Sequence, residues 1–202
     1  MIETILYPSD NQFGIPALLP ERQANGLITP CLAWGSIARR ATMPGTWHFY
    51  VDDYRFNGLL KQPDTLLHTA CVAAIEPNIT IPPGLPLALA LARLYRKRWL
   101  ARHWQQAGVS VWVDLHVAPE LAAYNLLGVP AGWRAYATRG YNANVAEIAA
   151  EYELAAQHAG ERPLFLVYGG GAAVQSLCLQ RGWLWLNEQR NLVHEQQIPP
   201  QA

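Results

Sequence analysis

The sequence predicts a single α/β domain with a mostly parallel sheet of five or six strands, either open or curved like part of a barrel. Three observations lead to this prediction. Short runs that are apolar throughout alternate with longer helical windows, which is typical of parallel strands buried on both faces. Proline stands near the start of these windows, and glycine follows their ends. The chain has 202 residues, 51% of them hydrophobic, and this length suits one domain.

The charge composition excludes several classes of protein. Lys and Arg together number 15, as do Asp and Glu, so the formal net charge is zero. Because only 15% of the residues are charged and half are apolar, the chain is neither disordered nor a polyelectrolyte tail. A neutral chain argues against a simple electrostatic binder of nucleic acid, although it permits a local basic surface.

The expected elements follow one another in strand–helix order. The strand runs are 47–51, 71–76, 109–115, 134–138 and 164–168, with 183–186 as an optional sixth. The helical windows are 63–70, 86–107, 119–127, 144–159 and one that begins near Ala172. Such units predict right-handed crossovers, and five or six strands are too few for a complete eight-stranded barrel.

Two flanking segments differ in composition from this central part. Residues 1–45 are rich in proline and glycine and are expected to form an arm on the core, with one short strand near 27–29. Residues 46–186 form the predicted α/β domain. Residues 187–202 are polar and are expected to be a frayed tail.

The cysteines and the apolar stretches indicate in which cellular compartment the protein is expected. Cys31, Cys71 and Cys178 are odd in number and far apart, so they predict neither a disulfide framework nor a Cys-x-x-Cys metal site. No secretory signal opens the chain, and its most apolar stretch, 85–92, is interrupted by proline and followed by arginine. We therefore expect a cytoplasmic protein with no membrane partner, and we assign no residues as metal ligands. The sequence names no cofactor.

Polar residues follow most of the expected strands, where parallel α/β sheets bind their ligands. They are Asp52, Asp53, Glu76, Asn78, Asp114, His116, Thr138, Arg139 and Tyr168. Asp53, Asp114 and His116 are the candidate catalytic residues, because strand alternation would place Asp114 and His116 on one face, where a carboxylate orients an imidazole or both bind a metal. The alternative is an ordinary hydrogen-bonded pair, with Asp52 or Asp53 capping the next helix.

Gly169, Gly170 and Gly171 lie between an expected buried strand and the helix near Ala172. Glycines at such a place let backbone N–H groups approach a phosphate at the helix N-terminus. Because no Walker or Gly-x-Gly-x-x-Gly pattern is present, a tight turn that needs positive φ explains them equally well.

The long helical window carries the strongest charge imbalance. Residues 77–113 contain no acid. The basic and aromatic residues that could form a nucleic-acid surface are Arg93, Arg96, Lys97, Arg98 and Trp99. Arg98 and Arg102 fall on the apolar stripe and should find carboxylates, carbonyls or a phosphate, so Arg96, Arg98 and Arg102 are candidate phosphate ligands. The competing interpretation is a packed amphipathic helix whose cations reach solvent.

Three segments together resemble one known family: the aromatic run ending in Asp52-Asp53-Tyr54, the Tyr95-Arg96-Lys97-Arg98 element and Tyr168-Gly169. Over about residues 45–186 the chain is similar to the domain-of-unknown-function family numbered 4417. The resemblance implies a phage, plasmid or other mobile-element setting.

Two positions depart from the family pattern. Pro77-Asn78 stands where the family has Pro-Asp, and Val113-Asp114 stands where the family has Pro-Asn. If the first carboxylate carries a family activity, this member lacks that activity or has moved its acid to Asp114.

Three functions fit these residues. The one we favour is a nucleic-acid-associated protein of a mobile element, acting in replication, maintenance or defence through the Arg-rich helix. The second is a small α/β enzyme for a phosphorylated or anionic small molecule, with Asp53, Asp114 and His116 as acid or base, Arg98 as anion clamp and the glycine loop as phosphate cradle. The third is a non-catalytic assembly subunit that binds a partner protein or itself.

Overall fold

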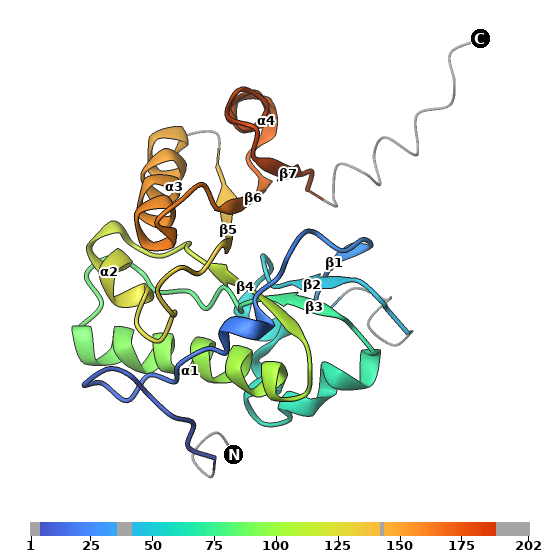
Figure 1. Cartoon of the computed structure of the whole chain (residues 1–202), viewed down its shortest axis with the longest axis vertical. Coiled ribbons are helices and arrows are strands. Elements are labelled where there is room, and N and C mark those ends of the chain that lie inside the picture. Colours follow the sequence, from blue (N-terminus) through green and yellow to red (C-terminus); the bar gives the residue numbers. More distant parts are fainter. Residues whose placement is uncertain (1–4, 36–41, 142–143, 189–202) are drawn as a thin grey trace.

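The computed structural model describes residues 5–35, 42–141 and 144–188, which form a parallel sheet flanked by helices (Figure 1). All neighbouring strands are parallel, and their spatial order is their order in the chain. The seven strands are β1 (Cys31–Ala33), β2 (Thr46–His48), β3 (Ala73–Ile75), β4 (Ser110–Asp114), β5 (Ala135–Gly140), β6 (Leu164–Gly169) and β7 (Leu184–Leu186).

The strand count corrects the predicted five or six. Each of the six expected runs overlaps a strand, and β1 is the seventh. The strand expected near 27–29 lies instead at Cys31–Ala33, where Cys31 pairs with Thr46 of β2. Proline has no N–H to give to a ladder, so the regular pairing begins at the residue after Pro30.

The helices are α1 (Leu87–Gln106), α2 (Ala122–Asn125), α3 (Val145–Ala159) and α4 (Gly171–Arg181). The window 63–70 is not an α-helix. It forms two 3-10 turns, Pro63–Thr65 and Leu67–Thr69, and ends at Ala70 with a φ of 55°. Eight residues are too few to make a stable α-helix without extensive packing, and short 3-10 turns are the usual substitute. The window 119–127 likewise shortens to a 3-10 turn followed by α2.

The sheet curves into a half-barrel. The rings of His48 on β2 and Tyr168 on β6 have centroids 4.3 Å apart. In a flat sheet, strands four places apart would be separated by about 19 Å, at roughly 4.8 Å per strand. The contact therefore requires strong curvature, and it confirms the barrel-like form of the predicted sheet.

The pairing register shows which side chains of the concave face lie side by side. Ala33 pairs with His48, Ile75 pairs with Trp112, and Asp114 pairs with Ala137, which in turn pairs with Leu166. Toward the carboxyl ends of the strands this face becomes polar, with Tyr50, Asp114 and the paired residues Arg139 and Tyr168. The half-barrel therefore has an apolar floor, with His48 as its exception, and a polar mouth.

Helices cover the convex face (Figure 1). The aromatic residues Trp47 and Phe49 pack with Trp99 and Trp104 of α1, and the rings of Phe49 and Trp104 stack at 5.5 Å. At the other end, α3 and α4 pack on β5–β7. No helix in the described part of the chain combines the length and the apolar character that crossing a membrane requires.

The N-terminal segment completes the sheet below the mouth. Pairing between β4 and β5 starts only at Val113. Below that point, Gln23 bridges to Val111, and the N–H of Ala24 donates to the carbonyl of Val111. Ile15 and Leu18 are buried beside it. The segment thus covers backbone groups of β4 that β5 does not reach.

Candidate ligand site at the mouth of the half-barrel

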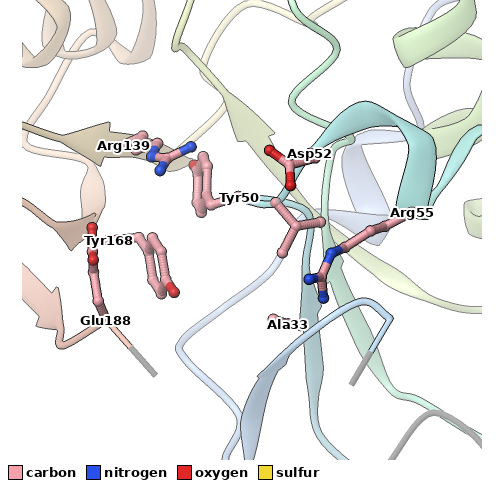
Figure 2. A pocket seen from close by; sticks show the side chains of 8 residues that line it. Ala33, Tyr50, Asp52, Arg55, Arg139, Tyr168 and Glu188 are labelled. Carbon is pink, nitrogen blue, oxygen red and sulfur yellow. The ribbon is translucent and has the colours of Figure 1, made fainter. Parts of the chain in front are cut away.

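A cavity of about 290 Å³ opens at the carboxyl ends of the strands (Figure 2). Parallel strands that share one direction bring the residues that follow them to one edge, so residues distant in sequence meet there. The lining residues come from or just after β1, β2, β5, β6 and β7. They are Ala33, Tyr50, Val51, Asp52, Arg55, Arg139, Tyr168 and Glu188.

Two arginines face this cavity from opposite sides (Figure 2). Arg139 projects from β5, and Arg55 belongs to the 3-10 turn Asp53–Arg55 after β2. Within the described residues, neither arginine has a carboxylate within 4.0 Å. Nε of Arg139 is buried without a hydrogen-bond partner in that same part of the chain, and its guanidinium lies 5.0 Å from the ring of Tyr141. Arg139 therefore has donors free for a ligand.

Tyr50 and Tyr168 form the aromatic wall of the cavity. Their rings stack with centroids 5.3 Å apart and an interplanar angle of 14°. The Tyr50 hydroxyl donates to Oδ1 of Asp114 at 3.1 Å. Burial, and then the negative charge of Asp114, raise the pKa of Tyr50 well above its ordinary value. Tyr50 is thus a neutral hydrogen-bond donor rather than a nucleophilic phenolate.

His48 lies directly beneath the mouth. Its ring is 1% exposed, and neither ring nitrogen has a partner among the described residues. Burial, aided by the positive charge of Arg139, lowers the pKa of His48 to about 3. The imidazole is therefore neutral at physiological pH.

A buried ionic network supports the mouth from the side of α1. Lys97 pairs with Asp114 (Nζ–Oδ2 2.9 Å), and Arg98 pairs with Glu76 (2.5 Å). The Arg98 guanidinium also donates to the carbonyl of Asn125 at 2.6 Å. All five residues are at most 2% exposed. Each buried charge thus has a counter-charge and further hydrogen bonds, as buried ions require.

This network corrects the predicted placement of the Arg-rich helix. Lys97, Arg98 and Trp99 are buried and cannot belong to an exposed nucleic-acid surface. The helix itself carries no acid. The acids that pair with its cations are Glu76, which follows β3, and Asp114, at the end of β4. Arg98 has found a carboxylate and a carbonyl, two of the partners expected for it.

The remaining cations of α1 are more peripheral. Arg93 donates to the carbonyl of Thr80, and Arg96 is exposed. Arg102 donates to Gln106 Oε1 at 2.8 Å and lies 4.8 Å from the ring of Tyr7. None of the three lines the mouth cavity.

The predicted catalytic residues are not brought together in the cavity. The carboxylate of Asp53 accepts hydrogen bonds from the N–H and hydroxyl of Thr80, and its neighbour Asp52 lines the cavity instead. Asp114 is engaged by Lys97 and Tyr50.

His116 does not share a strand face with Asp114, because β4 ends at Asp114. The backbone N–H of His116 donates to Asp114 Oδ1, and the imidazole lies 3.9 Å from Glu151. The predicted imidazole–carboxylate arrangement therefore involves a glutamate of α3.

The glycine loop adopts positive φ at Gly169, Gly170 and Gly171 (76°, 87° and 67°). A Cβ on Gly170 would lie 2.5 Å from Cγ2 of Val174, so the position requires glycine. The tight-turn interpretation accounts for the loop, and none of the three glycines lines the cavity.

The set of strand-end residues from the sequence already contained Asp52, Arg139 and Tyr168. It missed Tyr50, Arg55 and Glu188. Tyr50 could have been found, because it alternates with His48 on the run 47–51. Arg55 and Glu188 lie after turns, and their positions follow from the curvature of the sheet. No group of three or more His, Cys, Asp or Glu side chains suited to a metal ion occurs among the described residues.

Comparison with known proteins gives a family and two relatives. The family described as Domain of unknown function (DUF4417) matches residues 7–145, which begins in the N-terminal segment rather than near residue 45 as expected. Gene 1 protein of Mycobacterium phage D29 is 30% identical over 132 residues, covering 62% of this chain and 48% of the relative. Gene 1 protein of Mycobacterium phage L5 is 29% identical over 132 residues, covering 62% and 56%.

The chain spans about half the length of these curated relatives. No solved structure matches it.

Proposed function

The chain belongs to the DUF4417 family and is of phage type, with similarity to mycobacteriophage proteins, and we propose that it binds a phosphorylated or otherwise anionic small molecule at the mouth of the half-barrel. The unpaired arginine at this mouth carries the proposal. Arg139 projects into the cavity without a carboxylate partner in the described residues, and its Nε is buried. A buried donor without a partner costs about 1–3 kcal/mol, which an anion would recover.

The geometry supports a ligand with one anionic group and a longer body. Arg139 presents a planar fork that suits phosphate or carboxylate oxygens. Arg55 stands across the cavity and can hold a second anionic oxygen, while Asp52 favours a hydroxyl or amine donor on the same ligand. The neutral hydroxyl of Tyr50 is held by Asp114, so the wall of the site is rigid.

The test is calorimetric titration with pyrophosphate and with adenosine monophosphate at low salt. Removing one of the two arginines by Arg139→Met should weaken binding by at least tenfold, because charge-assisted hydrogen bonds contribute roughly 1.5–3 kcal/mol. Arg55→Met should act in the same direction. The matched control is Arg22→Met, since Arg22 does not line the cavity and its guanidinium makes a long contact of 3.4 Å to the carbonyl of Gly108.

The same variants also test nucleic-acid association, when they are titrated with single-stranded DNA. Arg96 is the exposed cation of the Arg-rich helix, so Arg96→Ala should leave pyrophosphate binding unchanged. If neither anion binds, or if Arg139→Met binds both as tightly as the parent, the proposal is wrong. Salt-dependent binding of single-stranded DNA that Arg96→Ala weakens and Arg139→Met does not would favour the nucleic-acid function instead.

A further inference from the structure

A second cavity, of about 190 Å³, lies on the convex side of the sheet and shares no lining residue with the mouth. It is bounded by α3 and by the segment that joins β4 to α2. The apolar lining consists of Leu115, Val117, Pro119, Ala122, Ala150 and Leu154. An engineered apolar cavity of about 150 Å³ is large enough to bind benzene, so this cavity has room for a small ring.

Two carboxyl groups stand over this apolar lining. Glu147 and Glu151 are one turn apart on α3, on the stripe that also carries Ala150 and Leu154. Like charges four residues apart destabilise a helix. In the described residues, no lysine or arginine lies within 4.0 Å of either carboxyl group, and Nδ1 of the His116 imidazole lies 3.9 Å from Glu151.

Glu151 is the inner member of the pair. Its side chain is 16% exposed, and its Oε2 is buried with no hydrogen-bond partner in the described chain. Glu147, in contrast, is exposed and accepts a hydrogen bond from the Asn144 side chain at 2.7 Å. The hydroxyl of Thr138 also faces Glu151 and lowers its pKa, but within the described residues neither this hydroxyl nor Oε2 of Glu151 has a hydrogen-bond partner within 3.5 Å, while Glu147 marks the solvent side of the cavity.

We propose that this cavity binds a small apolar molecule with a single ammonium group, whose charge lies between Glu147 and Glu151. The apolar body fills the space over Ala122 and Ala150, and the ammonium donates to the buried oxygen of Glu151. The two carboxyl groups favour a cation over a neutral molecule of the same shape, because an ammonium group donates to Glu151 and stabilises its charged form, which a neutral molecule does not.

Binding should release a proton. Burial raises the pKa of Glu151 to about 8, so the empty site holds this group as the neutral acid at pH 7. The groups that face it from the packed elements oppose one another: Asp114 and Glu147 raise its pKa, Thr138 and Lys97 lower it, and His116, whose own pKa is lowered mainly by burial, stays neutral beside it. An ammonium ion favours the carboxylate. Affinity should therefore rise about tenfold per pH unit up to about pH 8 and level off above it.

The experiment is calorimetric titration of the full chain with benzylamine, whose ammonium stays charged at pH 6, 7 and 8, and with benzyl alcohol as its neutral counterpart. We expect benzylamine to bind at least tenfold more tightly than benzyl alcohol at pH 8. Titration in two buffers of different ionisation enthalpy should show close to one proton released for each benzylamine bound at pH 6 and 7.

Three variants test whether benzylamine binds in this cavity rather than elsewhere on the protein. Glu151→Gln should remove both the preference for the amine and the proton release, whereas Glu153→Gln, an exposed glutamate of the same helix, should change neither. Ala150→Leu should block both molecules by filling the cavity. Equal binding of the alcohol and the amine, proton release that persists in Glu151→Gln, or no binding of benzylamine at millimolar concentration would each overturn the proposal.

Discussion

Asp114 is held by groups from four separate parts of the chain. Its carboxylate accepts from Tyr50, Lys97 and the N–H of His116, and its own N–H donates to Glu76. At a residue that is 0% exposed, each of these bonds replaces water that folding has removed. The carboxylate therefore positions Tyr50 at the mouth rather than acting on a ligand itself.

Removal of this carboxylate tests the network. Asp114→Ala leaves Lys97 charged and buried without its ion-pair partner, and we expect a loss of about 3–5 kcal/mol in the free energy of unfolding, measured with urea. The double variant Lys97→Met/Asp114→Leu should recover most of this loss, since an apolar pair needs no desolvation of charge. Equal stability of Asp114→Ala and the parent would contradict this account.

His48 predicts a pH dependence of stability. Its pKa in the folded chain, about 3, lies below the ordinary 6.5, so below pH 6.5 the unfolded chain binds a proton that the folded chain does not. Stability should fall with pH from 6.5 toward 3, by roughly 1.4 kcal/mol per pH unit from this residue. Urea unfolding at pH 7, 5 and 4 should show a shallower fall in His48→Phe. The exposed His68→Gln serves as control and should follow the parent.

At the scale of elements, α1 shows why some features could be predicted and others could not. Its ends, Leu87 and Gln106, lie within one residue of the predicted window, because proline and glycine mark both boundaries. Its buried face could be predicted in part, because Arg98 and Arg102 fall on the apolar stripe, where a cation needs a partner. The burial of Lys97 on the same face is not predicted. The helix alone does not identify the acids that pair with these cations, because Glu76 and Asp114 lie elsewhere in the chain.

The start of α4 depends on Gly170, which has a φ of 87° and precedes the helix. We expect Gly170→Ala to lower stability by about 2–4 kcal/mol, because left-handed strain adds to the clash of its Cβ with Val174. Gly132→Ala is the matched control, since Gly132 also has positive φ (79°) but nothing lies within 4 Å of its added Cβ. It should lose only the strain, about 1–2 kcal/mol. Thermal unfolding measures both, and equal losses would exclude the clash.

At the scale of the whole molecule, the parallel sheet could be predicted because its strands are apolar on both faces. Two features could be predicted only in part. A short strand is expected in the Pro- and Gly-rich segment, but the position of β1 depends on its pairing with β2. A curved sheet is one of two predicted forms, and the sequence does not decide between them, because the curvature that brings Arg55 and Glu188 to one cavity results from packing across the concave face.

The concave core joins both ends of the sheet, since Tyr50, Ile75 and Trp112 pack in one cluster with Leu166 and Tyr168. We therefore expect a single cooperative unfolding transition. Tryptophan fluorescence and far-ultraviolet circular dichroism should give coincident urea curves. The result should hold in Trp99→Phe and Trp183→Phe, which remove reporters from opposite ends of the sheet. Two resolved transitions would show that the ends unfold independently.

The order of the strands also bears on how the chain folds. Because each strand from β2 onward pairs with the strand just before it, each closure spans one short crossover, and the loop-closure entropy of each step is small. A sheet of this order has lower contact order than one in which the chain reverses about its first strand. It can grow outward from β1, one strand at a time, in the direction in which the ribosome delivers it. The segment around Gln23 and Ala24 is the exception, because its site on β4 is formed only later.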